Sequence, residues 1–324
     1  MSEAVIAGSL PNTDMTVEQR VNAAQAAAER ASRRTRWSLI APALIVIGVL
    51  GIAPLFIILI YSFLTPGAYG GVVWQFSTDA YVQFILEKDL FDESYHFTTA
   101  YFQIYARSIG LAAFTTVGSL ILGFPTAYFM ATRPAHQRNF WLFLITLPFW
   151  SNLLIRTFAM FVLMRDDGIV NNVLLEIGIL NKPFEIMFTD TAIGIALLYS
   201  FLPFMVLPIY ASLEKLDFRY VEAAYDLYAT RWKVLWRVII PLSKPGIVAG
   251  CLLVFIPALG AYVTPLLVGG GKSLMIGNLI ALQFSGSRNW PFGSAASLIL
   301  MALVLAALYI YVRYGTRKSG FAHG

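Results

Sequence analysis

The sequence is poor in charged residues. Aspartate, glutamate, lysine and arginine make up 13% of its 324 residues, whereas 58% are hydrophobic and the mean hydropathy is +0.69. Soluble domains carry about 25% charged residues, so this chain lacks much of the water-facing charge that such a domain needs. The composition therefore excludes an ordinary pair of soluble domains and predicts a membrane protein.

Reactive and metal-ligating side chains are also scarce. Cys251 is the one cysteine, so the chain cannot close a disulfide with itself, and its apolar surroundings are typical of a packed side chain. The three histidines are scattered, and the sequence contains no Ser/His/Asp set and no HExxH motif. The run Gly269–Ser273 lacks the earlier glycine of a nucleotide-binding loop. We therefore expect no catalytic site, no metal site and no cofactor, and we interpret this glycine run as a flexible turn.

Long apolar runs, by contrast, are abundant. A transmembrane helix needs about 20 predominantly apolar residues, and bundles tolerate the prolines that several of these runs contain. Six runs qualify, namely 38–63, 108–131, 141–164, 191–213, 245–267 and 295–314. The sequence predicts an all-α membrane protein with six transmembrane helices. The apolar stretch 274–284 is too short to span and is interpreted as re-entrant or interfacial.

Lysine and arginine are distributed unevenly between the two sides of these spans. If both termini are cytoplasmic, the inside segments hold 16 of the 23 basic residues and the outside segments hold six. Because basic residues concentrate on the cytoplasmic side of membrane proteins, we predict that both termini are cytoplasmic (N-in, C-in). This distribution also accounts for the pI near 9.2 without a nucleic-acid partner.

The chain divides into four predicted regions. Residues 1–36 form a cytoplasmic tail, in which 1–14 are disordered and 15–36 form a polar helix that meets anionic lipid headgroups. Because charged residues precede any apolar run, we do not expect a cleaved signal peptide. Residues 37–103 hold the first span and an external segment, 104–312 form the main membrane domain, and 313–324 are a cytoplasmic end.

The loop 214–244 connects two spans on the predicted cytoplasmic side. Asp217 is placed to cap a helix on which Glu222 and Asp226 share a face, and Ala223 and Ala224 leave that helix thin. We expect a second helix to place Trp232, Leu235, Trp236 and Ile239 on its apolar side and Arg231, Lys233 and Arg237 towards water, and to end at Pro241 and Pro245-Gly246. The pattern favours a docking surface and an interfacial linker equally.

The string Glu222-Ala223-Ala224, followed nineteen residues after Glu222 by Pro241, resembles the EAA loop of type I ABC importer permeases. The resemblance implies that the loop inserts into an ATPase subunit, with Glu222, Ala223, Ala224 and Asp226 as contact residues. Tyr228 departs from the family pattern, which has glycine there. Because tyrosine resists a positive φ, we expect a reshaped turn.

Further segments are similar to the spermidine/putrescine branch of that family. They are Leu147-Pro148-Phe149-Trp150, Ile155-Arg156, Leu202-Pro203-Phe204-Met205, Ser243-Lys244-Pro245-Gly246-Ile247, Gly277-Asn278 and Trp290-Pro291-Phe292-Gly293. The resemblance implies an ABC importer permease fold over 104–312 and a location in the bacterial inner membrane. The implied partners are two copies of an ABC ATPase subunit, a second permease subunit and a periplasmic solute-binding protein.

The implied cargo is a polyamine, and the close alternative is another small amine or amino-acid-like solute. The resemblance also implies that this chain is not an enzyme, because a separate ATPase subunit hydrolyses the ATP. Polyamine relatives often carry an acidic residue after the stretch that corresponds to Gly260–Val263, and this sequence has none there. That absence weighs against a polyamine.

Three residues are candidates for the translocation pathway. Arg156 is an intramembrane charge, but a bare arginine would repel a polycation, so a structural role paired to a carbonyl or an acid is favoured over a pathway role. Tyr262 and Trp290 offer aromatic faces to a cation, although packing is the commoner role of such residues.

Two other classes of protein remain open from the residues alone. A secondary transporter driven by an ion gradient usually shows inverted repeats and ionisable residues near the membrane midplane, and the sequence shows neither beyond Arg156. A membrane scaffold that transports nothing leaves the 214–244 loop unexplained.

Overall fold

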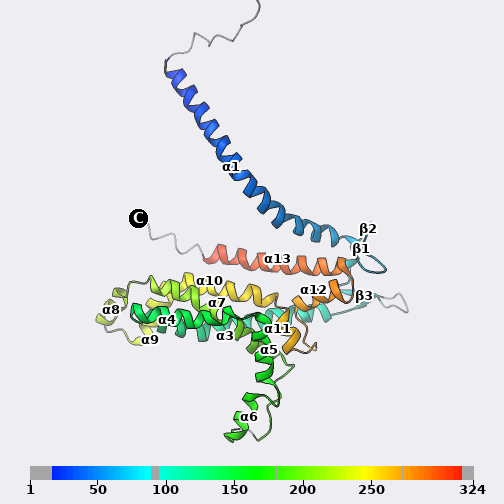
Figure 1. Ribbon diagram of the computed structural model, residues 1–324, viewed down its shortest axis with the longest axis vertical. Helices are drawn as coiled ribbons and strands as arrows, with labels where there is room; N and C mark the ends of the chain where they lie inside the picture. The colour runs from blue at the N-terminus through cyan, green and yellow to red at the C-terminus, as the bar shows by residue number, and fades with distance from the viewer. Residues whose placement is uncertain (1–16, 89–94, 180, 272, 316–324) are drawn as a thin grey trace, which may run out of the picture. The chain divides into compact units, whose positions relative to one another are not determined.

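The computed structural model describes residues 17–88, 95–179, 181–271 and 273–315. The chain divides into two compact units, residues 1–57 and 58–324. Helix α1 (Val17–Tyr61) is continuous through Pro42 and Pro54, and its part Trp37–Tyr61 is apolar enough to span a membrane (blue in Figure 1). The helix predicted for 15–36 and the first span are therefore one helix. The disorder predicted for residues 1–14 lies outside the described residues.

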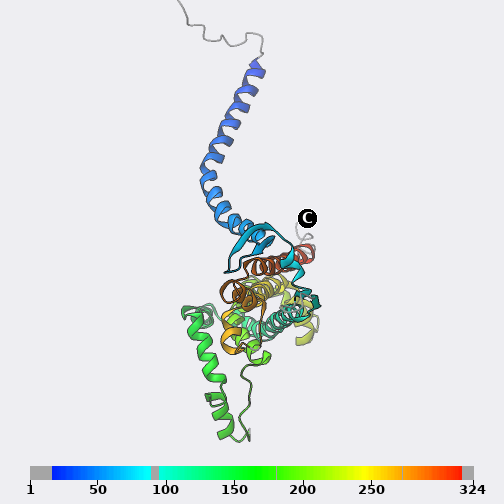
Figure 2. The same ribbon diagram turned by 90° about the vertical axis from the view of Figure 1, so that its right-hand side faces the viewer.

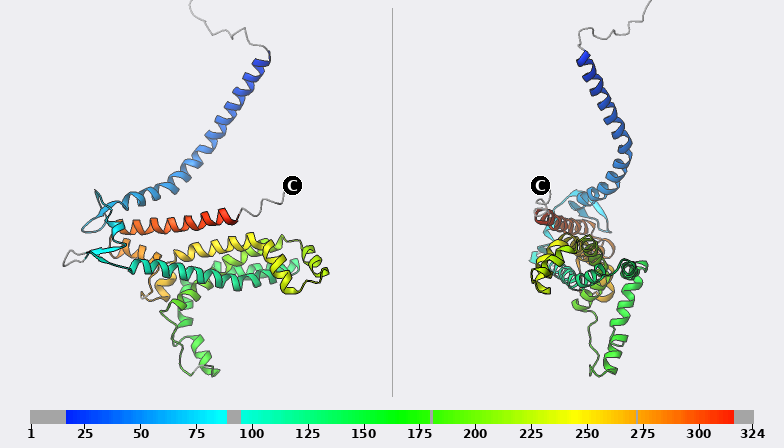
Figure 3. Two further views of the ribbon diagram at one scale, coloured as in Figure 1. Left: turned by 180° about the vertical axis from the view of Figure 1, so that it is seen from behind. Right: turned by 90° about the vertical axis from the view of Figure 1, so that its left-hand side faces the viewer.

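The second unit is built around three packed helices, α3 (Ala100–Ala131), α7 (Asp190–Glu214) and α10 (Ile240–Leu259). Together with α13 (Trp290–Gly315) they run side by side (Figures 1 and 3). The helices α7 and α10 approach closely because small residues line their contact. A Cβ on Gly246 would lie 2.5 Å from the Pro208 carbonyl oxygen, and one on Gly250 would lie 2.8 Å from Met205 Sδ. Such small residues let backbones pack in membrane helices.

Hydropathy finds five helices that can cross a membrane in the described chain, or six if a bent pair counts as one span. The prediction of a mostly helical membrane bundle is confirmed. The second, fourth and sixth predicted spans correspond to α3, α7 and α13.

The third predicted span, 141–164, is not one helix. Helix α4 (Ala135–Thr146) continues into the short 3₁₀ helix η1 (Leu147–Trp150), and α5 (Leu153–Met164) and α6 (Ile169–Glu176) then leave at 92° to it (Figure 1). The chain turns at Ser151-Asn152, where Asn152 Oδ1 accepts a hydrogen bond from the Leu154 backbone N–H at 2.8 Å. An asparagine N-cap starts a new helix, so the expectation of an unbroken span is wrong.

The predicted external segment holds the only strands of the described chain. Strand β1 (Leu64–Pro66) pairs antiparallel with β2 (Val72–Phe76), and β3 (Leu86–Lys88) pairs antiparallel with β4 (Tyr95–Phe97) (Figure 2). The one-turn helix α2 (Asp79–Val82) lies between the two hairpins. These short pairs were not predicted, and they do not alter the helical class of the fold.

The 214–244 loop and the fifth span are merged. Helix α8 (Arg219–Asp226) is followed by α9 (Arg231–Val234), the π-helical turn η2 (Leu235–Ile239) and α10 without a break, so helix runs from Arg231 to Leu259. The expectation that Pro241 and Pro245-Gly246 end the loop helix is wrong. A proline lacks an N–H and crowds the preceding turn, and the wider π turn, which ends at Ile239 in the turn before Pro241, accommodates both effects.

The fifth span also ends earlier than predicted, at Leu259 instead of 267. After three residues the short α11 (Val263–Val268) follows, and then α12 (Ile276–Ser285), which accounts for the apolar stretch 274–284 as a helix. Gly270 and Gly271 have φ of +58° and +77°, so the glycine run forms the predicted turn between them.

Candidate functional site

Helix α8 is fixed to the bundle by one side. Val221 is buried in the cluster that holds Leu213 of α7 and Ile239 at the end of η2. At its first turn, Asp217 Oδ1 accepts a hydrogen bond from the Arg219 backbone N–H at 3.0 Å. This bond is the cap that the sequence predicted, because the first N–H groups of a helix have no partner within it.

The other side of α8 is open. Glu222, Ala223 and Asp226 are exposed, whereas Ala224 is half-buried and packs against the core cluster. Pro241 lies at the beginning of α10, within the continuous helix. Three of the four predicted contact residues thus share the accessible surface of α8. Their contact with an ATPase stays a prediction.

The helix α8 ends in a Schellman motif with tyrosine at the left-handed position. Tyr228 has φ +54°, its N–H donates to the Tyr225 carbonyl at 2.9 Å, and the Ala229 N–H donates to the Ala224 carbonyl at 3.1 Å. These are the two bonds of the motif, in which glycine usually occupies the C′ position. The expectation of a reshaped turn is wrong, because two hydrogen bonds and the packing of Ala224 and Ala229 hold tyrosine in the conformation that glycine would adopt.

This turn projects two large side chains. Leu227 is 81% exposed and Tyr228 is 95% exposed. Left-handed backbone costs an L residue roughly 1–2 kcal/mol, so Tyr228 stores strain at the end of α8.

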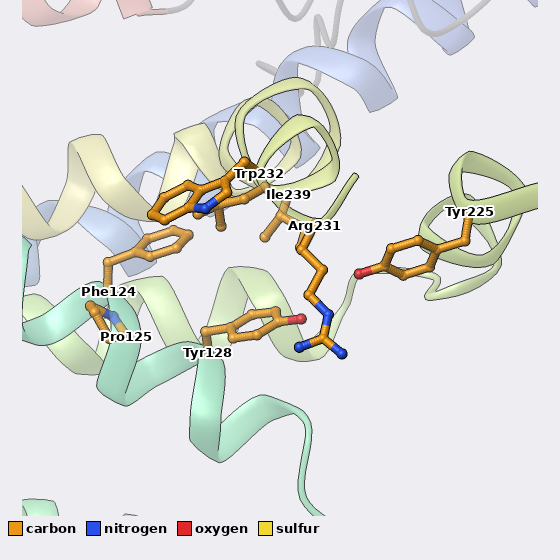
Figure 4. Close-up of a pocket in the computed structure, with 8 residues that line it drawn as sticks. Phe124, Pro125, Tyr128, Tyr225, Arg231, Trp232 and Ile239 are labelled. Atoms are coloured by element: carbon orange, nitrogen blue, oxygen red, sulfur yellow. The ribbon is translucent and has the colours of Figure 1, made fainter. Parts of the chain in front are cut away.

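A pocket of about 950 Å³ is lined by residues of α8, of α3 and of the helix that begins at Arg231 (Figure 4). It is lined by Phe124, Pro125, Tyr128, Tyr225, Arg231, Trp232, Leu235 and Ile239. The side chains of Tyr128, Tyr225 and Arg231 point into the same space. Helix α8 is therefore held at Val221 and Ala224 and is not packed solidly against α3 along its length.

The predicted apolar side of the second loop helix is only partly right. Ile239 is buried and Leu235 is half-buried, but Trp232 and Trp236 are exposed. Val234, which the prediction did not include, is buried instead. The π turn at Leu235–Ile239 shifts the period from that of an α-helix, and a pattern based on 3.6 residues per turn misplaces the tryptophans.

The three pathway candidates share no hydrogen bond, ion pair or ring contact within the described chain. Arg156 Nη1 donates to the Pro148 carbonyl oxygen across the break of the third span at 3.3 Å, and Arg156 Nε is buried without a partner. The hydrogen bond supplies the carbonyl partner that a structural role requires. Trp290 has its ring centroid 6.2 Å from that of Tyr61 and 6.4 Å from that of Phe284, so it packs among aromatics.

Tyr262 lies in the break between α10 and α11. Its backbone carbonyl oxygen accepts a hydrogen bond from Asn278 Nδ2 at 2.9 Å, and its side chain is 43% exposed. Asn278 is only 5% exposed, and its Oδ1 has no hydrogen-bond partner in the described chain. Sequence reasoning did not single out Asn278 as a site residue, although the pair Gly277-Asn278 belongs to the segments that carry the family resemblance.

Comparison with known proteins places these features in a family. Residues 100–318 match the family model described as the binding-protein-dependent transport system inner membrane component. The spermidine/putrescine transport system permease protein PotB of Salmonella typhi is 46% identical over 213 residues, which are 66% of this chain and 74% of that protein. PotB of Escherichia coli K12 is 45% identical, over 66% of this chain and 78% of PotB.

A more distant relative and two solved structures are also similar to this chain. The inner membrane ABC transporter permease protein YdcU of Escherichia coli K12 is 32% identical over 66% of this chain and 71% of YdcU. The crystal structure of a bacterial ABC transporter involved in the import of the acidic polysaccharide alginate contains a chain similar in fold. Its TM-score is 0.62 at 17% identity, over 89% of this chain and 99% of that chain. A second structure, in complex with an alginate pentasaccharide-bound periplasmic protein, gives a TM-score of 0.63 at 17% identity, over 89% and 98% of the two chains.

Proposed function

The chain belongs to the family of binding-protein-dependent transport system inner membrane components, and from this premise we propose that it is the permease subunit of an ATP-driven importer of polyamines such as spermidine or putrescine. The cargo is proposed from the similarity to PotB. The chain supplies the pathway and its gating, and a separate ATPase hydrolyses ATP.

The observation that supports this mechanism most directly is that α8 is exposed on one side and packed against the helix bundle on the other. Its exposed side presents Glu222, Ala223 and Asp226, and its other side is fixed through Val221 to α7 and to the helix Arg231–Leu259. A partner that binds the exposed side and moves would move the ends of both helices, because a buried side chain transmits displacement to its neighbours. We assign this surface to one ATPase subunit, and a second copy of the ATPase binds the corresponding surface of a second permease subunit.

The remaining partners follow the same scheme. A periplasmic binding protein delivers cargo to the face opposite α8, and both termini lie in the cytoplasm on the same side as α8. The excess of basic residues in the segments next to α8 supports this orientation. Lipid headgroups contact the arginines of the tail.

The test is co-purification of the ATPase with the tagged chain from gentle detergent. Glu222→Lys reverses the charge on the exposed side of α8 and is expected to abolish co-purification, since like charges across an interface cost several kcal/mol. Glu176→Lys, at an exposed glutamate of α6, is the matched control and should co-purify as wild type does.

Two outcomes would contradict the proposal. If no ATPase accompanies the wild-type chain, the importer mechanism fails, and transport driven by an ion gradient should be measured next. If both variants retain the ATPase, an importer remains but α8 is not its coupling surface.

A further inference from the structure

The break between α10 and α11 concentrates acceptor groups that lack donors. Helix α10 ends at Leu259, and residues 260–262 are not helical. Pro265 has no N–H, so it cannot supply the bond that the Ala261 carbonyl would otherwise receive from four residues further on. Because carbonyls at the end of a helix have no partner within it, the last carbonyls of α10 present acceptors at this break.

The first turn of α12 packs directly on these carbonyls. A Cβ added to Gly277 would lie 2.6 Å from the carbonyl oxygens of both Gly260 and Ala261. The first N–H of α12, that of Ile276, already donates to Ser108 Oγ at 2.9 Å. Glycine at 277 thus brings the next residue, Asn278, against the break.

The orientation of the Asn278 amide is fixed by chemistry. The Tyr262 carbonyl can only accept, so the nitrogen of the amide must face it, and the 2.9 Å bond agrees. The amide oxygen is then left buried without a donor. An unsatisfied buried acceptor costs about 1–3 kcal/mol, and such a group in a native fold calls for an explanation.

Asn278 differs from the other buried polar atoms without partners in the described chain. Four of those are hydroxyl groups, which can donate, and one is a guanidinium nitrogen. These are Thr115 Oγ1, Ser119 Oγ, Thr157 Oγ1, Ser294 Oγ and Arg156 Nε. The Asn278 amide oxygen can only accept a hydrogen bond, so its missing partner must be a donor. The carbonyl oxygens of Gly260 and Ala261 can likewise bond only to a donor.

The break is reachable from one side. Gly260 is exposed, Gly277 is half-buried and the Tyr262 ring is partly exposed. An aromatic face next to carbonyl oxygens suits a cation. The sequence from 259 to 279 contains no acidic residue, so an ammonium group would be bound here by neutral acceptors and an aromatic ring.

We propose that this break is a binding subsite for a primary ammonium group of the cargo, with Asn278 Oδ1 and the carbonyls of Gly260 and Ala261 as acceptors and Tyr262 at its edge. The inference rests on the proposed function, which makes the cargo a polyamine. Asn278 Oδ1 is covered in this conformation, so the break opens to admit the ammonium. The continuous helix Arg231–Leu259 joins the break to the α8 loop, which makes opening dependent on movement there.

The test uses the complete transporter in proteoliposomes, with its partner permease, ATPase subunits and binding protein, and measures uptake of radiolabelled spermidine and putrescine. Asn278→Leu removes the acceptor and is expected to lower the uptake rate about tenfold, as the loss of a hydrogen bond to a charged group implies. Asn278→Asp keeps an acceptor at the same position and is expected to stay within about twofold of wild type. Asn278→Ala replaces the leucine variant if that variant does not assemble.

Ser294→Ala is the matched control, because it removes another buried polar atom without a partner, and uptake should not change. A purely structural role for Asn278 predicts instead that the leucine and aspartate variants lose uptake equally and lower the melting temperature of the cargo-free complex equally. That result overturns the subsite, as does wild-type uptake in the leucine variant. If the wild-type complex imports neither polyamine, the proposed cargo fails and the subsite fails with it.

Discussion

The helix that runs from Arg231 to Leu259 ends in two polar environments of opposite kind. Near its first residue, α8 presents the exposed acidic side chains of Glu222 and Asp226. At its last residue, the break presents neutral carbonyls and the buried amide of Asn278. Exposed charges suit a macromolecular partner that approaches through water, where they guide association. Buried neutral acceptors suit a small cation that must also be released, because hydrogen bonds to neutral acceptors are weaker than those to a carboxylate.

The two ends of this helix are also held differently. The loop end is held by the apolar side chain of Val221 and by the hydrogen bonds of the Schellman motif. The break end is held by close backbone packing of Gly277 on two carbonyl oxygens. We therefore expect substitutions to separate the two ends, and the region between them to affect both.

The largest effect is expected midway along the helix, where both ends depend on the same contact. Gly246→Ala would place a Cβ 2.5 Å from the Pro208 carbonyl oxygen and from Ser212 Cβ, so α7 and α10 must move apart. Overpacking of this kind costs about 3 kcal/mol. The thermal unfolding temperature of the purified complex should fall, and both ATPase co-purification and uptake should decrease.

The control for that variant is Gly110→Ala in α3, where nothing lies within 4 Å of an added Cβ. It should unfold at the wild-type temperature. Equal unfolding temperatures for the two variants would show that the contact of α7 with α10 is looser than the structure indicates.

A smaller effect, confined to one end, is expected from Gly277→Ala. The added Cβ would displace the carbonyls of Gly260 and Ala261, so polyamine uptake should fall about tenfold, in line with the loss of about one hydrogen bond to a charged group. Co-purification of the ATPase should be unchanged, because α8 is not touched. Loss of the ATPase together with uptake would mean that the two ends cannot be separated.

The smallest effect concerns the strain at the loop end. Tyr228→Gly and Tyr228→Ala both remove the exposed ring, but only glycine adopts a positive φ without strain. The glycine variant should be more stable than the alanine variant by about 1 kcal/mol, measured as the difference in thermal unfolding of the complex. Equal stability of the two variants would mean that the left-handed turn at Tyr228 is not maintained in the protein.

The sequence predicted the elements that depend on uninterrupted apolar runs. Helices α1, α3, α7 and α13 correspond to predicted spans because hydropathy over about 20 residues reports burial in lipid directly. The prediction of an unbroken third span was wrong because the residues around Asn152 are apolar. Only the hydrogen bond of the Asn152 cap marks the break there. The predicted start of the fifth span was wrong because a π-helical turn lets the helix continue through Pro241, whereas proline usually ends or kinks an α-helix.

The candidate site was predicted unevenly for similar reasons. The exposure of Glu222 and Asp226 followed from a local helical pattern, and so did the cap at Asp217. The conformation of Tyr228 was predicted wrongly, because the intrinsic preference of one residue is outweighed by two hydrogen bonds to its neighbours. The environment of Asn278 was not predicted, since its partner carbonyl belongs to a residue 16 positions away, and only folding brings the two together.

The position of Gly246 in the helix Arg231–Leu259 has a mechanical consequence. A helix of 29 residues is about 43 Å long at 1.5 Å per residue, and Gly246, which packs tightly against α7, lies near its midpoint. Such a helix can act as a lever whose fulcrum divides it into arms of similar length. A tilt of about 10° would carry each end roughly 4 Å in opposite directions, which is more than the length of a hydrogen bond. A displacement of the helix end next to α8 would then produce a displacement of nearly equal size at the break, in the opposite direction.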